Sequence, residues 1–209
     1  MEVQEALSQV AEIRRHLLRT EFYRGYRSPV MAATSLVAVG AAAVQGALLD
    51  SPQAGGWVGA DDLGFVRFWL VVAAVNLLLV STDVMLCYIP RLSREQQRSA
   101  YNVVGQFIPS LCGAALVTWG CARVGATMLL PGLWCTLFSM GVFASRPYLP
   151  RGVGWVGLFY LACGMGLLAL APTGEALTPW AMGAPFGIGQ LSLGLVLYYN
   201  LERPGRHAQ

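Results

Sequence analysis

The chain has 209 residues, of which 56% are hydrophobic and 12% are charged, and its mean hydropathy is +0.53. Soluble domains usually carry about 25% charged residues, so this composition excludes a disordered chain, a collagen-like chain and an ordinary soluble enzyme. The net charge is +3, but the arginines are dispersed along the chain, so no nucleic-acid partner is expected. A chain this apolar is typical of a protein that crosses a lipid bilayer several times.

The first predicted element is an amphipathic helix at residues 2–19. Its apolar residues recur at three- and four-residue steps, and they are Val3, Ala6, Val10, Ile13 and Leu17. Charges begin at Glu2 and no apolar run precedes residue 28, so no signal peptide is expected. The helix is charge-balanced and lacks aromatic residues, unlike most helices that lie on a membrane surface. We therefore expect segment 1–28 to pack on cytoplasmic loops or on the same helix of a second copy.

Six apolar segments follow, and they define a predicted transmembrane domain at residues 29–200. A hydrocarbon core about 30 Å thick is crossed by about 20 helical residues. Each segment has about this length, and turn or charge signals separate the segments. They cover residues 29–49, 65–87, 102–121, 127–145, 153–171 and 180–200. We expect an all-α bundle of six transmembrane helices, with residues 201–209 as a cytoplasmic tail.

The arginines orient this bundle. With six crossings, only Arg67 and Arg123 fall on one side, and the other twelve of the 14 basic residues fall on the opposite side. This distribution follows the positive-inside rule and places both termini in the cytoplasm. Lysine is absent, and Ala, Gly and Arg are abundant, which is typical of a bacterial coding bias. We therefore expect a multi-pass protein of the bacterial inner membrane, with the lipid bilayer as its surroundings.

The second segment carries two candidate ligand-binding residues, Asn76 and Asp83, one heptad apart on one helical face. An ionisable group inside hydrocarbon is costly, which makes Asp83 a functional-site hypothesis by default. The alternative is that Asp83 lies near the headgroups and pairs with an arginine such as Arg24 or Arg27. The distance of Gln106 from the inner end of the third segment is about the same as the distance of Asp83 from the inner end of the second segment. We predict that Asp83 and Gln106 face the same interhelical space.

Proline interrupts the third and sixth segments, at Pro109 and Pro185. Proline removes a backbone donor and clashes with the preceding turn, so it weakens the helix. These segments are the corresponding elements of two three-helix halves with opposite orientation. Interrupted helices at matching positions indicate a transporter site. The alternative is tight helix packing around two kinks.

A stripe of small residues in the sixth segment supports that alternative, because it allows close helix approach. It contains Gly183, Gly187 and Gly194 together with Gln190, which can hydrogen-bond across the contact. We predict that this stripe faces the bundle interior and that the helix bends near residues 181–183. Single polar groups in the other segments could line a cavity or bridge helices, and they are Thr34, Gln45, Trp134 and Tyr160.

No catalytic residue, metal ligand or cofactor is expected. The two histidines are His16 and His207, and none of the five cysteines forms a CxxC pair. No nucleophile–base pair or pair of embedded carboxylates is present, so an intramembrane enzyme is the weakest of three functional classes. The first class is a small-solute permease or ligand-binding membrane protein with its site between the second, third and sixth segments. The alternative is a non-catalytic structural or accessory subunit of a membrane complex or homo-oligomer.

Three strings of the sequence resemble those of small uncharacterised bacterial six-helix integral membrane proteins. The strings cover residues 19–27 (RTEFYRGYR), 130–134 (LPGLW) and 179–190 (PWAMGAPFGIGQ). The likeness extends over most of the chain. It implies the six-helix architecture and no particular activity, because none is assigned to that group.

Overall fold

The computed structural model describes residues 28–49, 62–91, 94–174 and 176–202. The helix predicted at residues 2–19, the connection at 50–61 and the tail residues 203–209 lie outside this part of the chain. The described residues are almost all helical, and no strand occurs among them. Within this part of the chain, six helices are long and apolar enough to cross a membrane.

The six helices are α2 (Ser28–Leu49), α3 (Asp62–Thr82), α4 (Arg94–Val124), α5 (Leu130–Ser145), α6 (Val153–Leu170) and α7 (Pro179–Leu197). Two π-helical segments, η2 (Asp83–Tyr88) and η7 (Tyr198–Glu202), extend α3 and α7. Short 3₁₀ turns are η3 (Ile89–Arg91), η4 (Thr127–Leu129), η5 (Arg146–Tyr148) and η6 (Ala171–Thr173). Helix α4 starts well before the predicted residue 102, because the sequence REQQRSA at 94–100 is polar but rich in helix-forming residues. The apolar part of α4 covers Val104–Val124.

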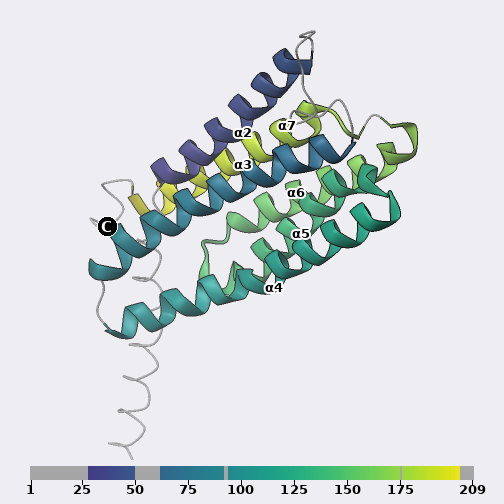
Figure 1. The fold of residues 1–209 in the computed structure, drawn as a ribbon. Coiled ribbons are helices and arrows are strands. Elements are labelled where there is room, and N and C mark those ends of the chain that lie inside the picture. The colour runs from purple at the N-terminus through teal and green to yellow at the C-terminus, as the bar shows by residue number, and fades with distance from the viewer. Residues whose placement is uncertain (1–27, 50–61, 92–93, 175, 203–209) are drawn as a thin grey trace, which may run out of the picture.

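The helices follow one another around an open ring. Helix α2 packs most extensively on α7, and α3 packs on α2, α4 on α5, α5 on α6, and α6 on α7. Helices α3 and α4 are the exception, because this consecutive pair makes little close contact although a short connection joins it. Figure 1 shows α5 and α6 in the interval between α3 and α4. The ring is therefore closed by α2 and α7 and open between α3 and α4.

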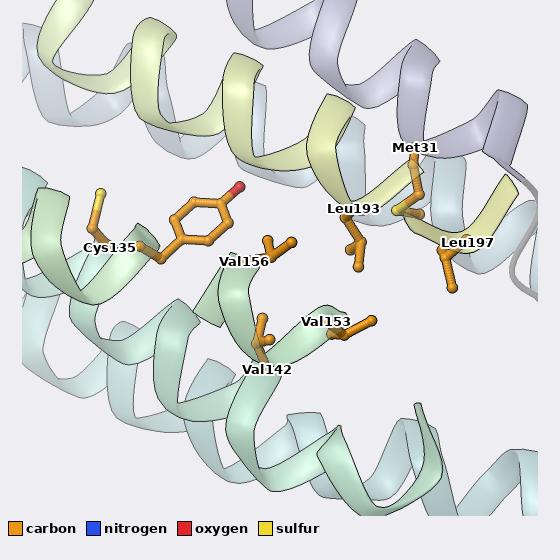
Figure 2. Close-up of a cluster of buried hydrophobic side chains, with 8 residues drawn as sticks. Met31, Cys135, Val142, Val153, Val156, Leu193 and Leu197 are labelled. Atoms are coloured by element: carbon orange, nitrogen blue, oxygen red, sulfur yellow. The ribbon is translucent and has the colours of Figure 1, made fainter. Parts of the chain in front are cut away.

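The packed core lies where α2, α5, α6 and α7 meet. Figure 2 shows side chains from these four helices converging, and the fully buried members include Cys135, Val153 and Leu197. The Tyr160 side chain of α6 is also fully buried in this cluster. Helix α3 contributes to a second buried cluster, in which its Phe65 and Trp69 pack with Ala42 of α2 and Met182 of α7.

Neither proline interrupts its helix. Helix α4 continues on both sides of Pro109, and α7 continues on both sides of Pro185. Helix α7 begins with Pro179 in its first turn, and the Thr178 hydroxyl accepts a hydrogen bond from the backbone N–H of Ala181. A capped start with proline at the first position stabilises the turn that precedes Pro185. The interruption expected in the sixth segment is therefore a local loss of one hydrogen bond within a continuous helix.

Candidate functional site

A cavity of about 450 Å³ lies at the open side of the ring. Side chains of α3 and α4 form its two sides, and side chains of α2, α5 and α7 form its inner wall. Most of the lining is leucine, valine, alanine, methionine and phenylalanine, and the described lining carries no charged side chain. Cavities of this size with mostly apolar walls and a few polar groups are typical of small-ligand sites.

The cavity opens sideways between α3 and α4. Several of its lining residues are also exposed on the outer surface of the bundle: Leu70, Leu77 and Met85 along α3 and η2, and Ile108 and Leu111 along α4. A residue that both lines a cavity and reaches the outer surface lies at its mouth. These five residues therefore mark an apolar opening between the two helices, which we call the α3–α4 opening.

Aromatic side chains meet at the inner wall opposite this opening. Phe138 of α5 contacts Phe107 of α4 and Phe186 of α7, with centroid separations of 5.5 Å in both pairs. Phe186 also contacts Tyr160 of α6 at 5.4 Å. Edge-to-face or tilted aromatic pairs thus join α4 to α5, α5 to α7 and α7 to α6, and such pairs are more favourable than area burial alone.

Most polar groups of the lining already have partners. The indole N–H of Trp134 donates to the Thr118 hydroxyl at 2.8 Å, which joins α5 to α4. The Thr34 hydroxyl donates to the Met31 carbonyl at 2.8 Å and lies 3.5 Å from the Gln190 side-chain oxygen of α7. These groups therefore hold helices together before any ligand is considered.

Two polar atoms of the lining have no partner. The side-chain oxygen of Asn76 in α3 and the hydroxyl of Ser145 in α5 are buried and make no hydrogen bond. Ser145 as a whole is only 1% exposed. A buried polar atom without a partner costs about 1–3 kcal/mol, so such atoms are rare in folded proteins. Both atoms belong to residues that line the same cavity.

Of the six residues predicted to bind a ligand, the cavity contains two. Asn76 and Gln190 line it, whereas Asp83, Gln106, Pro109 and Pro185 do not. Gln106 and Pro109 are exposed, Asp83 is half-buried and Pro185 is buried. The structure thus separates Asp83 and Gln106 from the space between α3 and α4.

Two local causes account for this separation. Helix α4 directs Phe107, Ile108 and Leu111 toward the cavity, which leaves Gln106 on another face. Asp83 begins the π-helical segment η2, where each turn holds an extra residue. From there, the helix face that carries Asn76 and lines the cavity continues with Val84 and Met85, and Asp83 lies off this face.

The glycines of the sixth segment lie against α2. A Cβ on Gly183 would collide with the Ala42 side chain, and one on Gly187 would collide with the Val39 side chain. A Cβ on Gly194 would lie 3.2 Å from that of Met31. The Ser35 hydroxyl donates to the Gly187 carbonyl at 2.7 Å across the same contact. All three glycines are buried, so the stripe forms a close contact between α2 and α7.

Sequence reasoning missed Ser145 and Thr118. Ser145 directly precedes Arg146, so it reads as the polar end of a segment rather than as part of a site. Thr118 bonds its own helix at the Ala114 carbonyl, 2.6 Å away, which is the common role of a threonine inside a helix. Only the packing of α4 on α5 gives Thr118 its second partner, and sequence spacing contains no signal for that.

The described residues contain no group of three His, Cys, Asp or Glu side chains placed to hold a metal ion. Comparison of the chain with protein-family models, with curated proteins and with solved structures found no match.

Proposed function

We propose that this chain is a multi-pass protein of the bacterial inner membrane, with both termini in the cytoplasm, that binds an apolar ligand in the cavity beside the α3–α4 opening. The six long apolar helices support the membrane location. So does the outer surface, where large apolar side chains such as Leu36, Leu116 and Trp155 are 72%, 69% and 75% exposed. An outer surface of this kind suits lipid and not water.

The cavity is the observation that carries ligand binding. It lies between the second, third and sixth spans, has a volume of about 450 Å³ and contains Asn76 and Gln190. Its uncharged, mostly apolar walls favour ligand binding over the transport of a polar solute. A pathway for a polar solute needs polar groups at successive depths. The α3–α4 opening gives the ligand a route from the bilayer that avoids water.

Fluorescence quenching by brominated lipid tests this proposal. Trp134 lines the cavity, and Trp155 is exposed on the outer surface. Two single-tryptophan proteins, each keeping one of these residues, are reconstituted in vesicles with brominated or ordinary acyl chains. Quenching of both tryptophans is expected, since an apolar chain can reach Trp134 through the opening. Quenching of Trp155 alone would show that the cavity is closed to the bilayer and would contradict the proposal.

A second candidate is the non-catalytic subunit, either of a larger complex or of a homo-oligomer. The observation that favours it is the outer face of α2, where Gly40, Ala43 and Ala47 are exposed at three- and four-residue spacing. A Cβ added to Gly40 would meet no atom within 4 Å, so this face has room for a neighbouring helix. Substitution of Gly40 by leucine tests it. Dissociation of an oligomer in mild detergent would favour the subunit, and an unchanged monomer would remove this support.

A further inference from the structure

We infer that the cavity holds an uncharged amphiphile with a single hydrocarbon chain, which has a hydroxyl group that bonds to Asn76 or Ser145. This inference rests on the proposed function and names the ligand class for it. Three observations carry it: the shape of the cavity, the absence of charge from its described lining, and the two buried polar atoms without partners.

The cavity is long and narrow. Trp69 and Val84 both line it, and they lie fifteen residues apart along α3 and η2. At the rise of an α-helix this separation is about 22 Å. A volume of about 450 Å³ spread over such a length suits one extended chain better than a compact solute.

The lining determines the charge of the occupant. Its described residues include no Arg, Asp, Glu or His, and the nearest predicted acidic candidate, Asp83, lies outside it. A charged headgroup placed among these walls would be desolvated without a counter-charge, which is strongly unfavourable in a membrane. The ligand is therefore uncharged where it contacts the cavity.

The two unpartnered atoms determine the polar part of the ligand. Asn76 lies ten residues before Leu86, and Ser145 lies three residues before Tyr148, where their spans end on the same side of the bundle. These separations correspond to depths of about 15 Å and 5 Å from that side. A carboxamide oxygen accepts a hydrogen bond, and a serine hydroxyl donates or accepts one. A hydroxyl on the ligand satisfies either atom, because it can also do both.

Hydrogen bonding also explains how such a ligand is retained. An acyl chain gains little by leaving lipid for an apolar cavity, since lipid tails are as apolar as leucine. The free energy that favours the bound state must therefore come from the groups that lipid tails cannot satisfy. Those groups are Asn76 and Ser145, whose buried oxygens have no partner without a ligand.

Three probes separate the parts of this inference: monooleoylglycerol, which is uncharged with one chain; oleoyl lysophosphatidylglycerol, which is anionic with one chain; and dioleoylglycerol, which is uncharged with two chains. Binding to the full chain in detergent is followed by native mass spectrometry and by the shift in unfolding temperature. We expect monooleoylglycerol to bind at least tenfold more tightly than either of the others.

Four variants test the site. Asn76→Leu or Ser145→Ala, whichever removes the partner of the ligand hydroxyl, should weaken monooleoylglycerol binding about threefold to tenfold, the loss of one neutral hydrogen bond. Both should leave the ligand-free protein as stable or more stable, because each removes a buried polar atom without a partner. Ala73→Phe places a ring at a lining position and should abolish binding. Ala74→Phe is the matched control on the adjacent, exposed position of α3, and it should bind like the unaltered chain.

Each other outcome has a defined meaning. Equal binding of the anionic or the two-chain probe, still lost in Ala73→Phe, would overturn the ligand class and leave the proposed function standing. Unchanged affinity in both Asn76→Leu and Ser145→Ala would overturn the hydrogen-bonding role of these residues. Binding of all three probes that is insensitive to Ala73→Phe, or no binding at all, would overturn the proposed function together with this inference.

Discussion

Gly164 of α6 lies directly against Gly132 of α5, so that a Cβ on Gly164 would come within 2.9 Å of the Gly132 carbonyl oxygen. A Cβ on Gly132 would lie equally close, at 2.9 Å, to the Gly164 carbonyl oxygen. The two helix backbones come this close because glycine has no side chain at either position. The nearby Ser139 hydroxyl donates to the Gly157 carbonyl at 2.8 Å and joins the same two helices. Small residues and a hydrogen bond are the usual means by which membrane helices associate closely.

Gly164→Ala should destabilise the protein by about 1–3 kcal/mol, because the added methyl group meets backbone atoms that cannot move aside. The matched control is Gly166→Ala, two residues further along α6, where a Cβ meets no atom within 4 Å. Alanine there should be neutral or stabilise by up to about 1 kcal/mol through its helix preference. Unfolding in a titration with SDS measures both. Equal effects of the two substitutions would contradict the close backbone contact.

Gly187→Leu should also destabilise by about 1–3 kcal/mol through overpacking of the α2–α7 contact. The Cβ of a residue at 187 would lie 2.5 Å from Cγ2 of Val39, and the Ser35 hydroxyl bonds the Gly187 carbonyl from the same side. A thermal-shift assay in detergent makes the comparison with Gly120→Leu, a position on α4 where a Cβ has no neighbour within 4 Å. If Gly187→Leu were neutral, the stripe would not be a tight contact.

A buried hydrogen bond connects α3 to α2, since the Trp69 indole N–H donates to the Gln45 side-chain oxygen at 2.8 Å. Both side chains are buried. A double-mutant cycle with Trp69→Phe and Gln45→Leu should give a coupling free energy of about 0.6–1.7 kcal/mol, the range for polar pairs between membrane helices. A coupling of zero would show that α3 is held to α2 by shape alone. The cycle is measured by SDS unfolding of the four proteins.

Reporter fusions test the orientation of the bundle. Alkaline phosphatase folds only outside the cytoplasm, so it should be active when fused after Pro172, between α6 and α7. It should be inactive when fused after Pro147, between α5 and α6. The expected difference follows from the arginine distribution, which predicts that Arg146 and Arg151 lie on the cytoplasmic side. A reporter inserted within residues 51–62 that proved cytoplasmic would reverse this topology.

The helices themselves could be predicted from sequence because their length and hydropathy are local properties. The segments predicted at 29–49 and 153–171 correspond closely to α2 and to α6 with η6. The span predicted at 102–121 lies within the longer helix α4, which begins at Arg94 and has its apolar part at Val104–Val124. Hydropathy detects the part of a helix that suits hydrocarbon, and it does not detect a polar first turn.

The candidate site was less predictable because it depends on which helices fail to pack. Polar residues inside apolar segments directed attention to Asn76 and Gln190, which line the cavity, but the same reasoning selected Gln106, which is exposed. A short connection between α3 and α4 suggests packed neighbours. The actual separation follows from α4 packing on α5, where Gly141 lies directly beneath the Phe107 ring. A single sequence carries no signal of such a packing contact between residues that are far apart along the chain.

Hydrogen bonds hold helix α3 near both of its ends, and the side of α3 that faces α4 makes little close helix contact. At one end, the Thr127 hydroxyl beyond α4 donates to the Asp62 carboxylate at 2.9 Å. At the other, the Gln97 side chain of α4 donates to the Ile89 carbonyl at 3.1 Å. These two bonds oppose movement of α3 away from its neighbours, so a ligand would leave through the α3–α4 opening, and its polar groups would cross the apolar edge of that opening. The rate at which a ligand enters and leaves the cavity should therefore fall with each hydroxyl group that the ligand carries. Helix α3 would in this way discriminate between ligands by their exchange rates without moving.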